Sequence, residues 1–152
     1  KTDTAALSTS GTSFTSNLTG LDVSITPSQT SSTIYLSGFV IVSRTSDNPT
    51  GFLRLVRDGS AIAVGDAASN RALVTSGMTA SFTGTPDGNN RVAIPFTVID
   101  SPSTTSSVTY GVQLYNSSSS TQTLYVNRSA TDTDSANFGR TISSIVVMEV
   151  SA

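Results

Sequence analysis

The side chains that carry out most enzymatic chemistry are scarce in this sequence. The chain has no His and no Cys, and its single Lys and single Glu are Lys1 and Glu149. A Ser-His-Asp triad, a thiol nucleophile and a His-ligated zinc ion are therefore excluded. A Schiff-base or phosphate-binding lysine within the fold is not expected either, because Lys1 is terminal. We expect no catalytic residue and no cofactor, and hence a protein that is not an enzyme.

The most closely spaced carboxylates are Asp132 and Asp134, in the segment TDTDSAN (131–137). Two carboxylates are the usual minimum for glycoside hydrolysis. The same segment offers calcium the oxygens of Asp132, Asp134 and Asn137, but it lacks the spacing and the glycine of an EF-hand loop. The simpler interpretation is a solvated polar loop, and we expect no metal there.

Arginine supplies seven of the eight cations, since only one is Lys. Arg54 lies between two leucines, and Arg128 ends an expected strand. The guanidinium group makes planar, bidentate contacts that suit carboxylates and subunit interfaces. Three interpretations stay open for these arginines: pairing with Asp inside one subunit, pairing between subunits near a threefold axis, and a site for an acidic glycan.

Aromatic side chains offer a second kind of binding surface. Flat rings pack against the apolar face of a sugar, so a cluster of them is a candidate carbohydrate platform. The alternative is that they lie in the core or in a subunit interface, and the absence of Trp weakens the sugar hypothesis. The candidate residues are Tyr35, Phe39, Tyr110, Tyr115 and Tyr125.

The composition indicates one all-β domain. Among 152 residues, 36% are hydrophobic and only 12% are charged, while Ser and Thr together make up about a third. Thr favours strands and Ser favours turns, whereas helix-forming residues are few. The net charge of −2 gives no basic face for nucleic acid. No apolar run reaches membrane-spanning length, so no membrane insertion is expected.

Alternating apolar residues predict the individual strands. Residues 33–43 are apolar in both alternate sets, with Ile34, Leu36, Val40 and Val42 on one face and Tyr35, Phe39 and Ile41 on the other. Such a strand is covered on both faces, either by a second sheet or by a neighbouring subunit. The pair Asp58-Gly59 predicts a tight hairpin between residues 51–57 and 60–64. Further strands are expected at 21–25, 71–82, 91–99, 108–115, 124–128 and 142–150.

The remaining segments are expected to be connections. Residues 84–90 form a turn and 130–140 a polar loop, while residues 1–20 form an extended arm or one or two short edge strands. Pro95 places its strand at a sheet edge or a bulge. The last strand, 142–150, is so apolar that we expect it in the centre of a sheet. The prediction is an antiparallel β-sandwich of about nine to eleven strands, spanning residues 1–152.

Three separated segments carry a resemblance to a known family. The opening KTDTAALSTSGTSFTSNLTGLDVSITPSQTSSTIYLSGFVIV (1–42) resembles a recurring module of tailed-phage structural proteins, especially from marine and cyanobacterial phages. Phe52–Ala67 is similar to the family's FRLVRDGSAIAVGDA segment, except that Leu53 follows the Phe. The closing NRSATDTDSANFGRTISSIVVMEVSA (127–152) is similar to the family's N-R-S, Arg-Thr and M-E segments.

The resemblance implies a jelly roll similar to the trimeric heads of tumour-necrosis-factor proteins, located on the phage particle. The expected partners are two further copies of the chain, other virion proteins (a fibre shaft or the major capsid protein) and host surface polysaccharide. A tail-fibre head that binds the host, a capsid decoration protein, and a carbohydrate-binding or depolymerase module remain open as functions. We expect the trimer interface on the sheet that contains residues 33–43 and 142–150. Its expected contact residues are Tyr35, Phe39, Ile41, Val147, Arg54 and Arg128.

Overall fold

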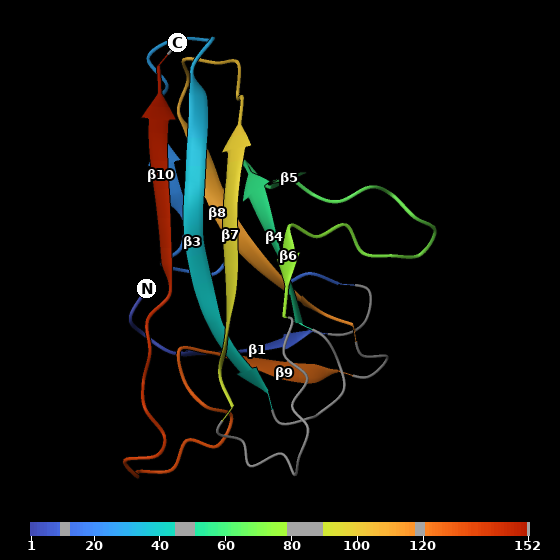
Figure 1. Cartoon of the computed structure of the whole chain (residues 1–152), viewed down its shortest axis with the longest axis vertical. Coiled ribbons are helices and arrows are strands. Elements are labelled where there is room, and N and C mark those ends of the chain that lie inside the picture. Colours follow the sequence, from blue (N-terminus) through green and yellow to red (C-terminus); the bar gives the residue numbers. More distant parts are fainter. Residues whose placement is uncertain (10–12, 45–50, 79–89, 118–120, 152) are drawn as a thin grey trace.

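The computed structural model describes residues 1–9, 13–44, 51–78, 90–117 and 121–151. Over these ranges the chain forms ten β-strands and no helix (Figure 1). The strands are β1 (Ala5–Thr9), β2 (Val23–Ile25), β3 (Thr33–Arg44), β4 (Gly51–Arg57), β5 (Ser60–Ile62), β6 (Ser76–Gly77), β7 (Val92–Asp100), β8 (Val108–Asn116), β9 (Gln122–Val126) and β10 (Ser144–Val150).

The strands form two antiparallel sheets that face each other. Sheet A has the order β1-β9-β3-β10, with β7 paired to β3, and sheet B has the order β2-β8-β4-β5, with β6 paired to β4. Successive strands cross between the sheets, since β2, β4 and β8 belong to sheet B while β3, β7 and β10 belong to sheet A. The fold is therefore an all-β sandwich of the jelly-roll kind, as the sequence predicted.

β3 is the longest strand and organises sheet A. It pairs with β7 from Ile34 to Val42, with β10 from Thr33 to Phe39, and with β9 only at its end, from Val42 to Arg44. β10 and β9 thus share one side of β3 in succession. In Figure 1, β3 bends where β10 gives way to β9.

The core lies between the sheets and is built by the inward set of each strand. On β3 this set is the one expected from the alternation, and each of its four members is fully buried. The inward set of β8, also expected from its alternation, is at most 4% exposed. The core residues from these strands are Ile34, Leu36, Val40, Val42, Val108, Tyr110, Val112 and Leu114, and Leu53, Leu55, Ile94, Phe96, Leu124 and Val126 complete the cluster from their neighbours.

Two local predictions are confirmed. β4 and β5 form a hairpin across Asp58 and Gly59, whose φ angles of 49° and 83° are those of a tight turn that needs left-handed residues. Pro95 lies on β7, which pairs only with β3 in the described part of the chain and so forms a sheet edge. An edge strand tolerates the missing N–H of proline.

The predicted position of the last strand is wrong. β10 pairs only with β3 in the described residues, so it is an edge strand and not a central one. Both of its alternate sets are apolar, which suggested burial on both faces, but the set Val146, Met148 and Val150 is 45–54% exposed. In the described part of the expected strand 71–82, which ends at residue 78, only Ser76–Gly77 pairs as a strand. Residues 79–89 lie outside the described residues, and they include all of the expected turn 84–90 except its last residue.

A polar contact joins the two sheets inside the sandwich. The Asp100 carboxylate lies at the end of β7 in sheet A. It accepts a hydrogen bond of 2.7 Å from the Tyr110 hydroxyl and forms an ion pair with Arg57 at 2.6 Å, and both of these residues belong to sheet B. The Tyr110 side chain is fully buried. A buried hydroxyl needs a partner, and Asp100 supplies it.

Candidate functional site

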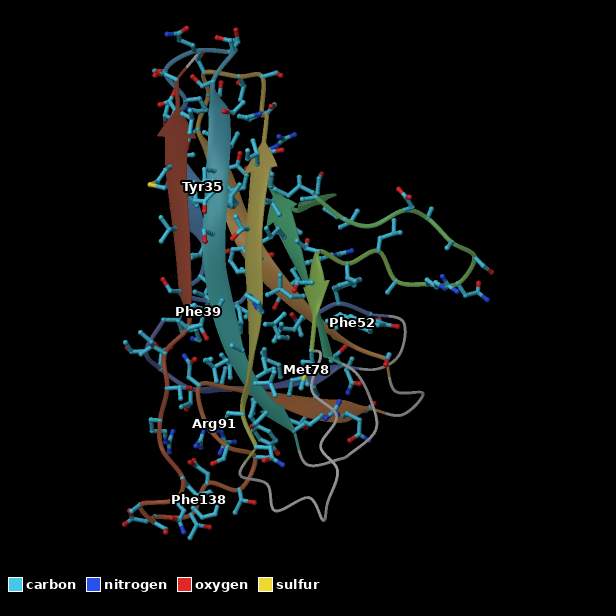
Figure 2. All side chains as sticks on the ribbon, in the orientation of Figure 1. Tyr35, Phe39, Phe52, Met78, Arg91 and Phe138 are labelled. Atoms are coloured by element: carbon cyan, nitrogen blue, oxygen red, sulfur yellow. The ribbon has the colours of Figure 1, made fainter. Side chains whose placement is uncertain are left out.

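The outer face of sheet A exposes apolar side chains on either side of a polar pair, Ser37 and Thr97, whose hydroxyl oxygens lie 3.3 Å apart. Tyr35, Phe39 and Ile41 of β3 are only half-buried, and Ile99 of the neighbouring β7 is 69% exposed. The exposed set of β10 extends the same surface, because Met148 pairs with Tyr35 and Val146 with Ser37. This face is turned towards the viewer in Figure 2, where Tyr35 and Phe39 are labelled along β3. We call the residues Tyr35, Phe39, Ile41, Ile99, Val146, Met148 and Val150 the apolar face.

The structure brings together only half of the expected interface residues. Tyr35, Phe39 and Ile41 share the apolar face, but Val147 points inward and packs against the core. The prediction took the wrong alternate set of the last strand as the outer one, since Val146 and Met148 on either side of Val147 are the exposed residues. The prediction that Arg54 shares a surface with Tyr35 is wrong, because Arg54 lies on β4 in sheet B.

Arg128 lies in the loop that follows β9 and is paired within the chain. Its guanidinium is 2.9 Å from the Asp132 carboxylate and lies over the Tyr125 ring, 4.4 Å from the centroid. Arg140 approaches the same carboxylate at 2.8 Å. Of the three interpretations of the arginines, pairing inside the subunit thus describes Arg128, Arg140 and Arg57.

The same contacts bear on the candidate calcium site. Both oxygens of Asp132 face arginine, so a cation would have to compete with two positive charges already in place. Asp134 and Asn137 are exposed in the same loop. No cluster of three or more acidic, His or Cys side chains with metal-binding spacing occurs among the described residues. The loop fits the solvated-loop interpretation better than a metal site.

The five candidate aromatic residues do not form one platform. Tyr35 and Phe39 lie on sheet A, Tyr110 is buried between the sheets, and Tyr125 is covered by Arg128. Tyr115 of β8 is part of a different group, on the outer face of sheet B.

That group is a row of three rings. The Tyr115 ring lies 5.0 Å from the Phe14 ring and 6.1 Å from the Phe52 ring, between centroids. Arg54 stacks on Phe14, 3.6 Å from its centroid, and its Nε donates to Gln113 at 2.8 Å. Burial lowers the pKa of Arg54. We call Phe14, Tyr115 and Phe52 the aromatic row.

The aromatic row borders a hollow on the outer side of sheet B. This hollow has a volume of about 480 Å³ and lies between the row and the loop that connects β5 to β6. Figure 1 shows this loop projecting from the sandwich. The lining residues are Phe52, Asn70, Arg71, Ala72, Tyr115 and Ser117.

Sequence patterns did not identify this hollow. Phe14 and Phe52 were not among the candidate aromatic residues, and no sequence pattern singles out Asn70. Tyr115 was a candidate aromatic residue, and residue 71 was expected as the start of a strand. About a hundred residues separate Phe14 from Tyr115, so only the pairing of the N-terminal segment with β8 brings them together. The one available signal was the pair Phe52 and Arg54 at a spacing of two, which places both on one face of a strand.

Comparisons with known proteins add no family to this picture. No protein-family model matches the chain, and no curated protein matches it. Within the described ranges, no helix is long and apolar enough to cross a membrane.

Proposed function

We propose that this protein is a non-enzymatic structural protein of a bacteriophage particle, a homotrimeric tail-fibre head that binds the host cell surface. The observation that carries the proposal is the apolar face of sheet A. Monomeric soluble proteins seldom expose several large apolar side chains together on neighbouring strands, and such surfaces mark association sites.

A second copy of the chain is the partner that this face fits best. The residues of the apolar face are uncharged, so two copies of it meet without like-charge repulsion. β10 is also an edge strand with an unpaired side in the described part of the chain, and an uncovered apolar edge favours aggregation. A closed assembly of a few copies would cover the apolar face and would not extend into a larger aggregate.

The assignment to a phage particle is supported by the resemblance of three segments to the tailed-phage module. The first segment supplies β1 to β3, and the second supplies the β4–β5 hairpin and the start of the loop that follows it. The third supplies β10 and the loop before it. The segments therefore span both sheets, so the resemblance extends across the sandwich.

The location of the chain on the particle tests the proposal. Antibodies raised against the purified protein, or cryo-electron microscopy of the particle, should place it at the tips of tail fibres in few copies. Hundreds of copies at threefold positions of the capsid would instead identify a decoration protein. Absence from purified particles would refute both.

The non-enzymatic part of the proposal has its own test. Incubation with host polysaccharide should release no reducing sugar. Release that is lost in Asp132→Asn or Asp134→Asn, but not in Asp66→Asn, would overturn this part and identify a depolymerase. Asp66 is the matched control because it is exposed in a loop of the other sheet.

A further inference from the structure

The hollow beside the aromatic row has the composition of a small ligand site. Its volume of about 480 Å³ lies within the range usual for such sites, roughly 300–1,000 Å³. Phe52 and Tyr115 supply aromatic walls, and Asn70, Arg71 and Ser117 supply polar groups at the rim. A mainly apolar cavity with a few convergent polar groups is the usual arrangement for recognising an organic molecule.

The aromatic walls are held in place by the fold. Phe52 lies against Gly77 of β6, where an added Cβ would be only 2.7 Å from its Cδ1 atom. Tyr115 is 8% exposed and packs between Phe14 and Phe52. Figure 2 shows Phe52 beside β6, at the base of the projecting loop. The rings are therefore positioned before any ligand arrives, which reduces the entropy cost of binding.

The two arginines beside the row are in different situations. Arg54 is used within the fold, since it stacks on Phe14 and donates to Gln113. Gln113 in turn donates to Asn17, and Asn17 to Asp22, so Arg54 begins a chain of side-chain hydrogen bonds. Arg71 is exposed at the rim, and within the described ranges its guanidinium forms no ion pair or hydrogen bond.

A free guanidinium next to aromatic walls selects a particular ligand chemistry. Its fork of N–H groups matches a carboxylate in bidentate geometry. Aromatic walls pack against the C–H face of a pyranose ring. The Asn70 amide has donors and an acceptor for sugar hydroxyls, and its side chain makes no hydrogen bond in the described part of the chain. A sugar ring that carries hydroxyls and one carboxylate matches the guanidinium, the aromatic walls and the Asn70 amide together.

We infer that the hollow between the aromatic row and the β5–β6 loop binds a hexuronic acid residue of an anionic polysaccharide. Arg71 holds the carboxylate, Phe52 and Tyr115 contact the ring, and Asn70 binds a hydroxyl. The inference deepens the proposed host-binding function, because it names the class of surface polymer that the head recognises.

Isothermal titration calorimetry with trigalacturonic acid tests the site, and neutral maltotriose is the matched control ligand. We expect saturable binding of trigalacturonic acid and none of maltotriose. Arg71→Gln should weaken binding about tenfold or more, since one charge-assisted hydrogen-bond pair is lost. Asn70→Ala should weaken it less. Arg140→Gln is the control for loss of one positive charge, because Arg140 is also exposed but lies in the loop before β10.

Thermal unfolding of each variant separates loss of binding from loss of folding. Asn70 and Arg71 are both exposed, so their substitutions should leave the fold intact. Absence of saturable binding by the folded wild type, equal binding of maltotriose, or equal loss in Arg71→Gln and Arg140→Gln would overturn the inference. Sedimentation of the same samples keeps the two proposals distinguishable. A trimer that binds no uronate refutes the site alone, and a monomer that binds it refutes the trimer alone.

Discussion

Met148 lies directly opposite Tyr35 in the pairing of β10 with β3, and both side chains are on the outer surface of sheet A. Met148 is 49% exposed, so an apolar side chain next to an aromatic ring is left in contact with water in the isolated subunit. On its other side Tyr35 is opposite the exposed Ile99 of β7, so these three side chains cross the apolar face in one row. A methionine side chain adapts to irregular neighbours, which suits a surface that meets another copy.

Met148→Lys should therefore separate subunits without unfolding them. A lysine at an exposed position costs the isolated subunit little, whereas burying its charge in an apolar interface is strongly unfavourable. Sedimentation velocity should show loss of the trimer, while circular dichroism stays β-rich. Ala61→Lys is the matched control, because Ala61 is exposed on the edge strand β5 of sheet B. Equal effects of the two substitutions would count against the apolar face as the interface.

Gly38→Ala should destabilise the fold at the middle of β3. An added Cβ would meet the carbonyl oxygen of Ser144 and lie 2.7 Å from Cζ of Phe96 and 3.0 Å from Cα of Ile145. Two of these three atoms belong to the backbone of β10 and cannot move without disturbing its pairing with β3. Overpacking of this kind costs about 1–3 kcal/mol.

Urea unfolding measures this cost as a lower midpoint. Gly139→Ala is the control, since an added Cβ there meets nothing within 4 Å. Equal midpoints for Gly38→Ala and the wild type would mean that β10 does not lie against Gly38 as described.

Tyr110 should make the stability of the sandwich sensitive to alkaline pH. Burial raises the pKa of Tyr110, and its hydrogen bond to Asp100 raises the pKa further. The folded state thus favours the protonated hydroxyl more than the unfolded chain does. This stabilisation is complete below the ordinary tyrosine pKa of about 10 and is lost as the pH rises towards the higher folded pKa.

Unfolding free energies of wild type and Tyr110→Phe, measured from neutral to alkaline pH, check this dependence. At neutral pH the variant should be less stable by about 1–3 kcal/mol, because the Asp100 carboxylate loses a donor. Above pH ~10 the difference between the two proteins should shrink. Parallel curves would show that Tyr110 does not titrate abnormally.

Glu149 should titrate below the usual range of a glutamate. The hydroxyl and the backbone N–H of Ser28 donate to its Oε1 at 2.6 and 2.7 Å, and these bonds lower the pKa of Glu149. The resulting stabilisation is present above the ordinary glutamate pKa and is lost as the pH falls through the lowered one. Because Glu149 is the only glutamate, its carboxyl signal is unambiguous in a selectively labelled NMR sample.

Ser28→Ala should raise this pKa towards the usual value, whereas Ser31→Ala, at an exposed serine nearby, should leave it unchanged. A Glu149 pKa that does not respond to Ser28→Ala would contradict the contact between the β2–β3 connection and β10.

The parts of the fold that were predictable are those specified by alternation or by turn chemistry. In β3 and β8 the inward residues are apolar at every second position, and their burial follows directly. The Asp58-Gly59 turn was predictable because few residue pairs tolerate two positive φ angles. Both features are local, so the sequence around them is sufficient.

The parts that could not be predicted depend on which strands become neighbours. In β10 both alternate sets are apolar, so the pattern alone left open whether Val146 or Val147 faces the core and whether the strand is central. The pairing of Asp132 with Arg128 and Arg140 depends on how one loop folds back on itself. The aromatic row joins three chain segments, and nothing in any one of them indicates the other two.

The mass of the protein in solution tests most directly whether further copies of the chain cover the apolar face. Sedimentation equilibrium at micromolar concentration should give about three times the chain mass of 15.6 kDa, with little dependence on loading. A single species of 15.6 kDa that keeps the Tyr35–Met148 surface in water would contradict the claim.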